Sequence, residues 1–127
     1  MAAAEALPDP LPAGGVNIPL RISFVGLKSA RVVALAHNNL APLLILFEDH
    51  LVQRVIFRKE RKYSEVEYVD VTRTDTDNLE IAYRDSSFTF SCKVRAEQDL
   101  VRALILLARK GVTLGDKARG LLSQQDR

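Results

Sequence analysis

The chain has 127 residues, of which 47% are hydrophobic, and 18 basic and 16 acidic side chains give it a formal net charge of +2. A chain of this length is expected to form one domain that folds without a metal or a disulfide. The small net charge argues against nucleic-acid binding driven by overall charge. The single cysteine, Cys92, excludes an internal disulfide and a Cys-rich zinc site.

The N-terminal sequence "MAAAEALPDPLPAGG" contains three prolines and lacks the basic region of a signal peptide. The longest apolar run, Leu40–Phe47, is far shorter than the roughly 20 residues of a membrane-spanning helix. Together with the single cysteine, these features predict a cytoplasmic protein. Because proline disfavours helices and central strands, residues 1–17 are predicted to be a flexible Pro/Ala/Gly-rich tail, and residues 18–127 a single domain.

The first part of the domain contains one clear strand and one ambiguous segment. The sequence "IPLRISFVG" at 18–26 alternates apolar and polar residues and is typical of a strand. Residues 28–39 fit two structures equally well. Ser29 could cap a short helix, and "RVVALA" could instead be a buried strand, because periodicity does not separate the two over so short a run.

Hairpins dominate the middle of the chain. The sequence "LLILFEDHLVQRVIF" at 43–57 has two runs rich in β-branched and aromatic residues around a polar step. A helix-like turn at Ser64–Glu67, followed by a strand from Tyr68, would bury three valines. The cluster "TDTDN" at 74–78 predicts a turn. The clearest hairpin is "LEIAYRDSSFTFSCKV" at 79–94. The three valines are Val66, Val69 and Val71.

The C-terminal part is predicted to be helical. Residues 96–110 carry a leucine-rich stripe with acids in the first turn and bases in the last, and Gly111 suits the position after a helix. A second short helix is indicated at about 114–123, with Thr113 as its cap and Asp116 three residues later. Strand hairpins followed by helices define an α+β domain.

From Pro42 to Gly111 the chain resembles the bacterial versions of the pleckstrin-homology-like (PH-like, GRAM-like) superfold. The resemblance implies an open antiparallel β-barrel or bent sheet that a C-terminal amphipathic helix closes. It also implies binding to proteins, peptides or lipid headgroups, or assembly, but it assigns no ligand residue by position. The segments that carry it are "LLILFEDHLVQRVIF", "YSEVEYVDV", "NLEIAYRDSSFTFSC" and "EQDLVRALILLARKG".

The residues that could carry catalysis fit structural roles better. The chain has no HExxH, CxxC, G-x-S-x-G or phosphate-loop pattern. His50 is expected to be a loop residue, and Cys92 alternates with phenylalanines as a small core residue would. We therefore expect no enzyme activity, no cofactor and no metal. Two carboxylate pairs are expected on solvated turns or strand faces, and these are Glu65 with Glu67 and Asp75 with Asp77.

A basic cluster at 54–62 is the best candidate site. Its side chains could bind an anionic lipid headgroup, each contributing about 1 kcal/mol near an anionic membrane. They could instead lie on a solvated strand face, paired with nearby acids. If the strand is regular, Arg54, Arg58 and Lys62 share one side. The cluster consists of Arg54, Arg58, Lys59, Arg61 and Lys62, and the nearby acids are Glu65, Glu67 and Asp70.

The leading expectation is a non-enzymatic interaction or scaffold module that works through protein contacts. An exposed strand edge would let it bind a partner or assemble with further copies of itself as a homo-oligomer. The alternative is peripheral binding to an anionic membrane surface through the basic cluster. Binding to RNA would need aromatic side chains among the basic ones, and only Tyr63 and Tyr68 are available.

Overall fold

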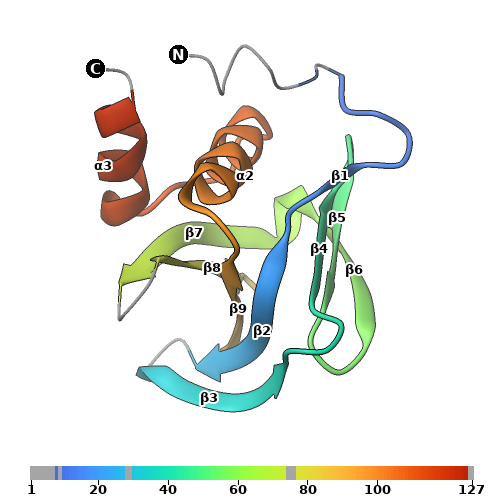
Figure 1. The fold of residues 1–127 in the computed structure, drawn as a ribbon, viewed down its shortest axis with the longest axis vertical. Helices are drawn as coiled ribbons and strands as arrows, with labels where there is room; N and C mark the ends of the chain where they lie inside the picture. The colour runs from blue at the N-terminus through green and yellow to red at the C-terminus, as the bar shows by residue number, and fades with distance from the viewer. Residues whose placement is uncertain (1–7, 9, 28–29, 74–76, 126–127) are drawn as a thin grey trace.

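The structure is a computed structural model that describes residue 8 and residues 10–27, 30–73 and 77–125 (Figure 1). The chain forms a series of strands and then two helices. In order these are β1 (Val16–Asn17), β2 (Leu20–Leu27), β3 (Ala30–Asn38), β4 (Leu43–Leu46), β5 (His50–Arg54), β6 (Arg58–Lys62), the 3-10 turn η1 (Tyr63–Glu65), β7 (Val66–Arg73), β8 (Asp77–Tyr83), β9 (Phe88–Val94), α2 (Glu97–Arg109) and α3 (Asp116–Gln125).

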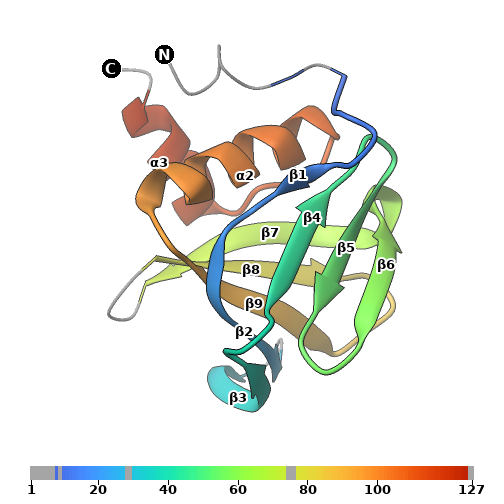
Figure 2. The same ribbon diagram turned by 45° about the vertical axis from the view of Figure 1, so that its right-hand side comes forward.

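The strands form two antiparallel sheets. One has the order β1-β4-β5-β6 and the other the order β3-β2-β9-β8-β7. In Figure 2 the strands of the first sheet cross those of the second, and α2 lies above the second sheet. This arrangement confirms the predicted α+β class with two C-terminal helices. Among the described strands, no hydrogen-bonded pair joins the two sheets into a closed barrel.

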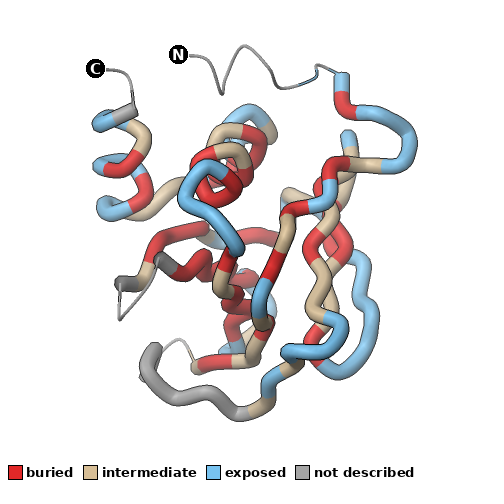
Figure 3. Tube along the Cα trace, viewed as in Figure 1, coloured by how far each residue is buried: buried red, intermediate tan, exposed pale blue. Residues whose placement is uncertain are grey.

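The core lies between the two sheets and α2. The three valines predicted to point inward are all buried, as are the alternating apolar residues of β8 and β9 apart from Phe88, which is half exposed at the start of β9. Leucines of α2 cover the open end of this layer, where the predicted stripe faces the sheets. In Figure 3 the buried positions gather where these elements face one another, while β6 runs exposed along the outside. Among the described residues, no helix is long and apolar enough to cross a membrane.

The domain begins earlier than the sequence predicted. Leu11 is buried and its backbone N–H donates to Glu48 Oε1 at 2.8 Å. Val16 and Asn17 form β1, which pairs with β4 at the edge of the first sheet. The prediction of a tail through residue 17 is therefore too long. Prolines suit an extended chain beside an edge strand, so they did not exclude residues 11–17 from the fold.

The ambiguous segment is a strand. Backbone pairing of β3 with β2 runs from Ser23↔Asn38 to Leu27↔Ala30, with register shifts on both sides of Gly26. These irregularities bend the hairpin, as bulges do. Residues 28 and 29, and with them the proposed Ser29 cap, lie outside the described residues. The same holds for 74–76 of the predicted "TDTDN" turn, whose last two residues belong to β8.

The helices lie close to their predicted positions, but α3 begins later than expected. The helix α2 spans 97–109 within the predicted 96–110, and Gly111 follows it with a φ of 80°. The carbonyl of Thr113 accepts the Val69 N–H at 2.9 Å, so Thr113 joins the chain to β7. In the first turn of α3, the Ala118 N–H donates to Asp70 Oδ1 of β7 at 3.0 Å.

Candidate functional site

Strand pairing divides the basic cluster between two faces of the first sheet. Arg54 lies opposite Arg58 in the β5–β6 register, and His50 lies opposite Lys62, so these positions share one face. Lys59 and Arg61 lie on the other face, which turns toward the second sheet. The alternation predicted from the sequence is confirmed. The five cations therefore do not form one continuous basic surface.

Arg61 is a buried member of the cluster. Only 9% of it is exposed, and its Nη2 donates to Asp85 Oδ1 at 2.8 Å. Its guanidinium carbon lies 4.0 Å from the centre of the Tyr83 ring, and Nη1 lies 3.6 Å from Glu65 Oε2. The hydrogen bond from Arg61 lowers the pKa of the Asp85 carboxyl below its usual value. The Nε of Arg61 has no hydrogen-bond partner.

The other four members differ in exposure. Arg54 is half-buried and its Nε donates to the carbonyl of Ala41 at 2.9 Å. Arg58, Lys59 and Lys62 are exposed. Of the acids expected to neutralise the cluster, Glu65 contacts Arg61 and accepts the backbone N–H of Lys62. Asp70 is instead buried beneath α3.

A cleft of about 400 Å³ opens between the β5–β6 turn and the β8–β9 turn, and we call it the turn cleft. Both turns lie away from α2 (Figure 2). Core residues line it, Tyr83 and Phe90 of the second sheet among them, and its charged side chains are those of Lys59, Arg61 and Asp85. Sequence reasoning missed this cleft, because it is made by two turns that are far apart in the chain.

Three large apolar side chains line the turn cleft and are exposed to solvent. Phe57 is 79% exposed, Ile56 64% and Phe88 50%, and we call these three residues the apolar rim. Leu40 is also exposed but does not line the cleft. Adjacent exposed apolar side chains are typical of a contact surface for another molecule. The signal in the sequence is the run "VIF" at 55–57, which its composition predicts to be part of a strand but which lies in the turn after β5.

Side-chain hydrogen bonds hold the β5–β6 turn in position. Asn38 Nδ2 donates to the carbonyl of Val55 at 2.7 Å, while its Oδ1 accepts the backbone N–H of Ala41 at 2.8 Å. Ser23 Oγ donates to the carbonyl of Arg54 at 2.6 Å. Ile56 and Phe57 of the apolar rim therefore extend from a turn that is anchored to β2 and β3, which defines its geometry without a partner.

A buried phenol forms part of the turn cleft. The Tyr83 hydroxyl donates to Gln53 Oε1, which connects β8 of one sheet to β5 of the other. Burial raises the pKa of Tyr83 well above its usual range, so the phenol is neutral at physiological pH. A neutral buried phenol that is hydrogen-bonded across the two sheets is a structural group, and it fixes their spacing at the cleft.

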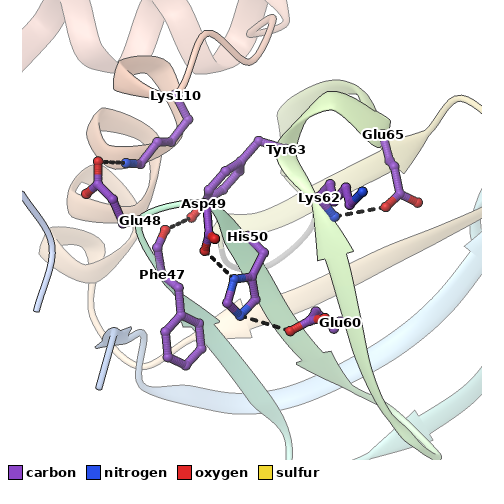
Figure 4. Close-up of polar contacts among 9 residues, drawn as sticks. All are labelled: Phe47, Glu48, Asp49, His50, Glu60, Lys62, Tyr63, Glu65 and Lys110. Carbon is purple, nitrogen blue, oxygen red and sulfur yellow. Dashed lines mark hydrogen bonds and ion pairs between the residues drawn. The ribbon is translucent and has the colours of Figure 1, made fainter. Parts of the chain in front are cut away.

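Figure 4 shows a second polar cluster, at the opposite end of β5 and β6. His50 stacks on Phe47, with Nδ1 2.6 Å from Asp49 Oδ1 and Nε2 3.1 Å from Glu60 Oε1. Nearby, Nζ of Lys110, which directly follows α2, lies 2.9 Å from Glu48 Oε2.

These contacts fasten the β4–β5 turn to β6 and α2. The Tyr63 hydroxyl adds a hydrogen bond to the carbonyl of Phe47. The Leu11 N–H and the Lys110 ammonium lower the pKa of Glu48 below its usual value. The cluster thus joins elements of the fold through pairs of its own side chains. Among the described residues, no group of three or more His, Cys, Asp or Glu side chains is placed to hold a metal ion.

Comparison with models of known protein families gives no match for this chain. Comparison with curated proteins finds no significant match either.

Proposed function

We propose that the protein is a non-enzymatic interaction module of the PH-like type that binds a protein partner through the turn cleft. The observation that carries the proposal is the apolar rim, in which Ile56, Phe57 and Phe88 are exposed around one cleft. Successive antiparallel hairpins and a helix across the open end of two sheets support the PH-like assignment. A scaffold of this kind works by presenting a surface, and the rim is the surface it presents.

The exposed aromatic side chains of the rim favour a contact with a protein. Burying apolar surface stabilises a complex by roughly 25 cal/mol per Å², and buried aromatic side chains dominate many interfaces. Phe57 lies in the turn between β5 and β6 and Phe88 begins β9, so a partner that covers both would bridge the two turns. The anchored β5–β6 turn reduces the ordering cost of binding, since its conformation is set beforehand.

The division of the basic cluster weighs against the anionic-lipid alternative. Arg58 and Lys62 share a face with Glu60 between them, while Arg61 is buried beside Asp85. A flat membrane surface would meet a mixed row of charges there. Protein binding at the rim needs no such row, and it uses side chains that are already exposed.

The test is selection of a random-peptide display library on the full chain. The selected peptides are then compared on wild type, on the double variant Phe57→Ser/Phe88→Ser and on Leu40→Ser. We expect peptides that bind wild type and Leu40→Ser and lose at least about tenfold in affinity on the double variant, as hot-spot removal does. Circular dichroism confirms that each variant is folded. Failure to enrich any peptide, or equal binding to all three proteins, would contradict the proposal.

Two further measurements separate the other candidates. A discrete dimer on sizing with light scattering that is lost in Phe57→Ser would identify the partner as a second copy of the chain. Salt-resistant sedimentation with anionic vesicles, lost in Arg58→Glu with Lys62→Glu but kept in Phe57→Ser, would replace the proposed function with lipid binding.

A further inference from the structure

We infer that the partner segment in the turn cleft is an acidic apolar peptide, whose hydrophobic side chain contacts the apolar rim while a neighbouring carboxylate pairs with Lys59 and Arg61. This inference rests on the proposed function and specifies the chemistry of its ligand.

Charge complementarity carries the first step. The strand β6 has four basic side chains and one acidic one, Glu60. Two of the basic ones, Lys59 and Arg61, lie on the face that lines the turn cleft. Lys59 is exposed there, so its ammonium group is accessible to a ligand. A positively charged ligand would be repelled at this wall of the cleft, and a negatively charged ligand would be attracted to it.

The hydrogen bonding of Arg61 carries the second step. Its guanidinium is buried at the wall of the cleft, and its Nε has no hydrogen-bond partner. A buried donor without an acceptor is costly, and a carboxylate is the strongest acceptor that a peptide can offer to a guanidinium. A ligand carboxylate that displaces Asp85 would therefore form a charge-assisted hydrogen bond with a guanidinium that is already held at the wall of the cleft.

Asp85 already places a carboxylate at this position. Its Oδ1 lies 2.8 Å from Arg61 Nη2, yet its side chain is 64% exposed and belongs to the β8–β9 turn. An incoming carboxylate can exchange with Asp85 at Nη2. In either state Arg61 keeps a counter-charge, so the exchange never leaves a buried charge unpaired.

The spacing of polar and apolar groups selects the peptide. Lys59 of β6 follows Phe57 of the β5–β6 turn by two residues, so a cation and an apolar side chain lie close together in the wall of the cleft. A cleft of about 400 Å³ has the size of a ligand site and suits a short segment rather than a folded domain. A hydrophobic residue adjacent to an aspartate or glutamate matches both groups.

The experiment uses two synthetic pools of nine-residue peptides measured by fluorescence polarisation at physiological salt. One pool combines Phe, Leu and Ile with Asp and Glu, and the other replaces each acid by its amide. We expect the acidic pool to bind wild type about tenfold tighter, as a charge-assisted hydrogen bond predicts. We also expect Lys59→Gln to reduce this preference and Asp85→Asn to tighten binding of the acidic pool, since it removes the internal competitor.

Lys62→Gln is the matched control, because Lys62 lies on the same strand and loses the same charge, but on the opposite face. Equal loss of binding in Lys59→Gln and Lys62→Gln would overturn the inference in favour of non-specific attraction. Equal binding of the two pools, with both lost in Phe57→Ser/Phe88→Ser, would overturn the inference and leave the proposed function standing. Binding of neither pool would contradict both.

Discussion

Asp70 joins two elements through a single buried carboxylate. Its Oδ1 accepts the Val71 N–H at 2.9 Å and the Ala118 N–H at 3.0 Å, so it serves both β7 and the first turn of α3. Gly115 makes this contact possible, because a Cβ added there would lie 2.2 Å from the Asp70 carboxyl carbon. The carboxylate thus does for α3 what a helix cap from the adjoining chain does elsewhere.

Replacing Asp70 by alanine is expected to destabilise the protein by about 1–2 kcal/mol, because the Ala118 N–H would lose its acceptor inside the protein. Urea unfolding followed by circular dichroism measures the change. The control is Asp116→Ala, which removes an exposed carboxylate from the same helix turn and is expected to cost under about 0.5 kcal/mol. Equal effects of the two substitutions would show that Asp70 does not hold α3.

At the scale of elements, β6 is an end strand. It pairs with β5 only, among the strands that the structure describes, and its five residues are all charged. Charged side chains on an end strand prevent pairing with the edge of another molecule. Arg58 and Lys62 on the outer face can serve this role while Lys59 and Arg61 line the turn cleft. The two faces of one strand therefore have different tasks.

The double variant Arg58→Val/Lys62→Val is expected to associate through β6, because it replaces edge charges by residues that favour strands. Light scattering across a concentration series measures the association. The variant Arg84→Val/Arg95→Val removes two exposed cations outside β6 and controls for net charge. If both double variants associate to the same extent, the charges of β6 have no special role.

The hairpins could be predicted from the sequence, whereas the structure of β3 and the start of α3 could not. The period-two alternation in 79–94 reports local geometry, and β8 and β9 follow it. The short apolar run of β3 carries no period, so only its pairing with β2 decides its structure. The start of α3 depends on Asp70, which lies 48 residues before Ala118 and is invisible to local patterns.

At the scale of the whole molecule, the candidate site combines predictable and unpredictable parts. The alternation in β6 predicted which cations share a face, but not that Arg61 is buried against Tyr83. The turn cleft forms only when the two sheets cross, because Phe57 and Phe88 come from separate hairpins and both line it. Sequence patterns report which residues are apolar, whereas their exposure depends on tertiary packing.

Cys92 provides a probe of global unfolding. Its side chain is fully buried in the core, and burial raises the pKa of the thiol well above its usual range. Because the thiolate is the reactive form, a thiol reagent is expected to label Cys92 only when the core opens. Labelling followed by mass spectrometry across a urea series should track the unfolding measured by circular dichroism. Rapid labelling in native buffer would show that the region around β9 opens separately.

Chemical-shift mapping of a selected peptide on the ¹⁵N-labelled full chain would locate the binding surface residue by residue. Binding at the turn cleft predicts the largest shift changes in residues 55–59 and 83–90, with little change in α3. Shift changes centred on β3, α3 or the outer face of β6 would contradict the claim that the apolar rim is the binding surface.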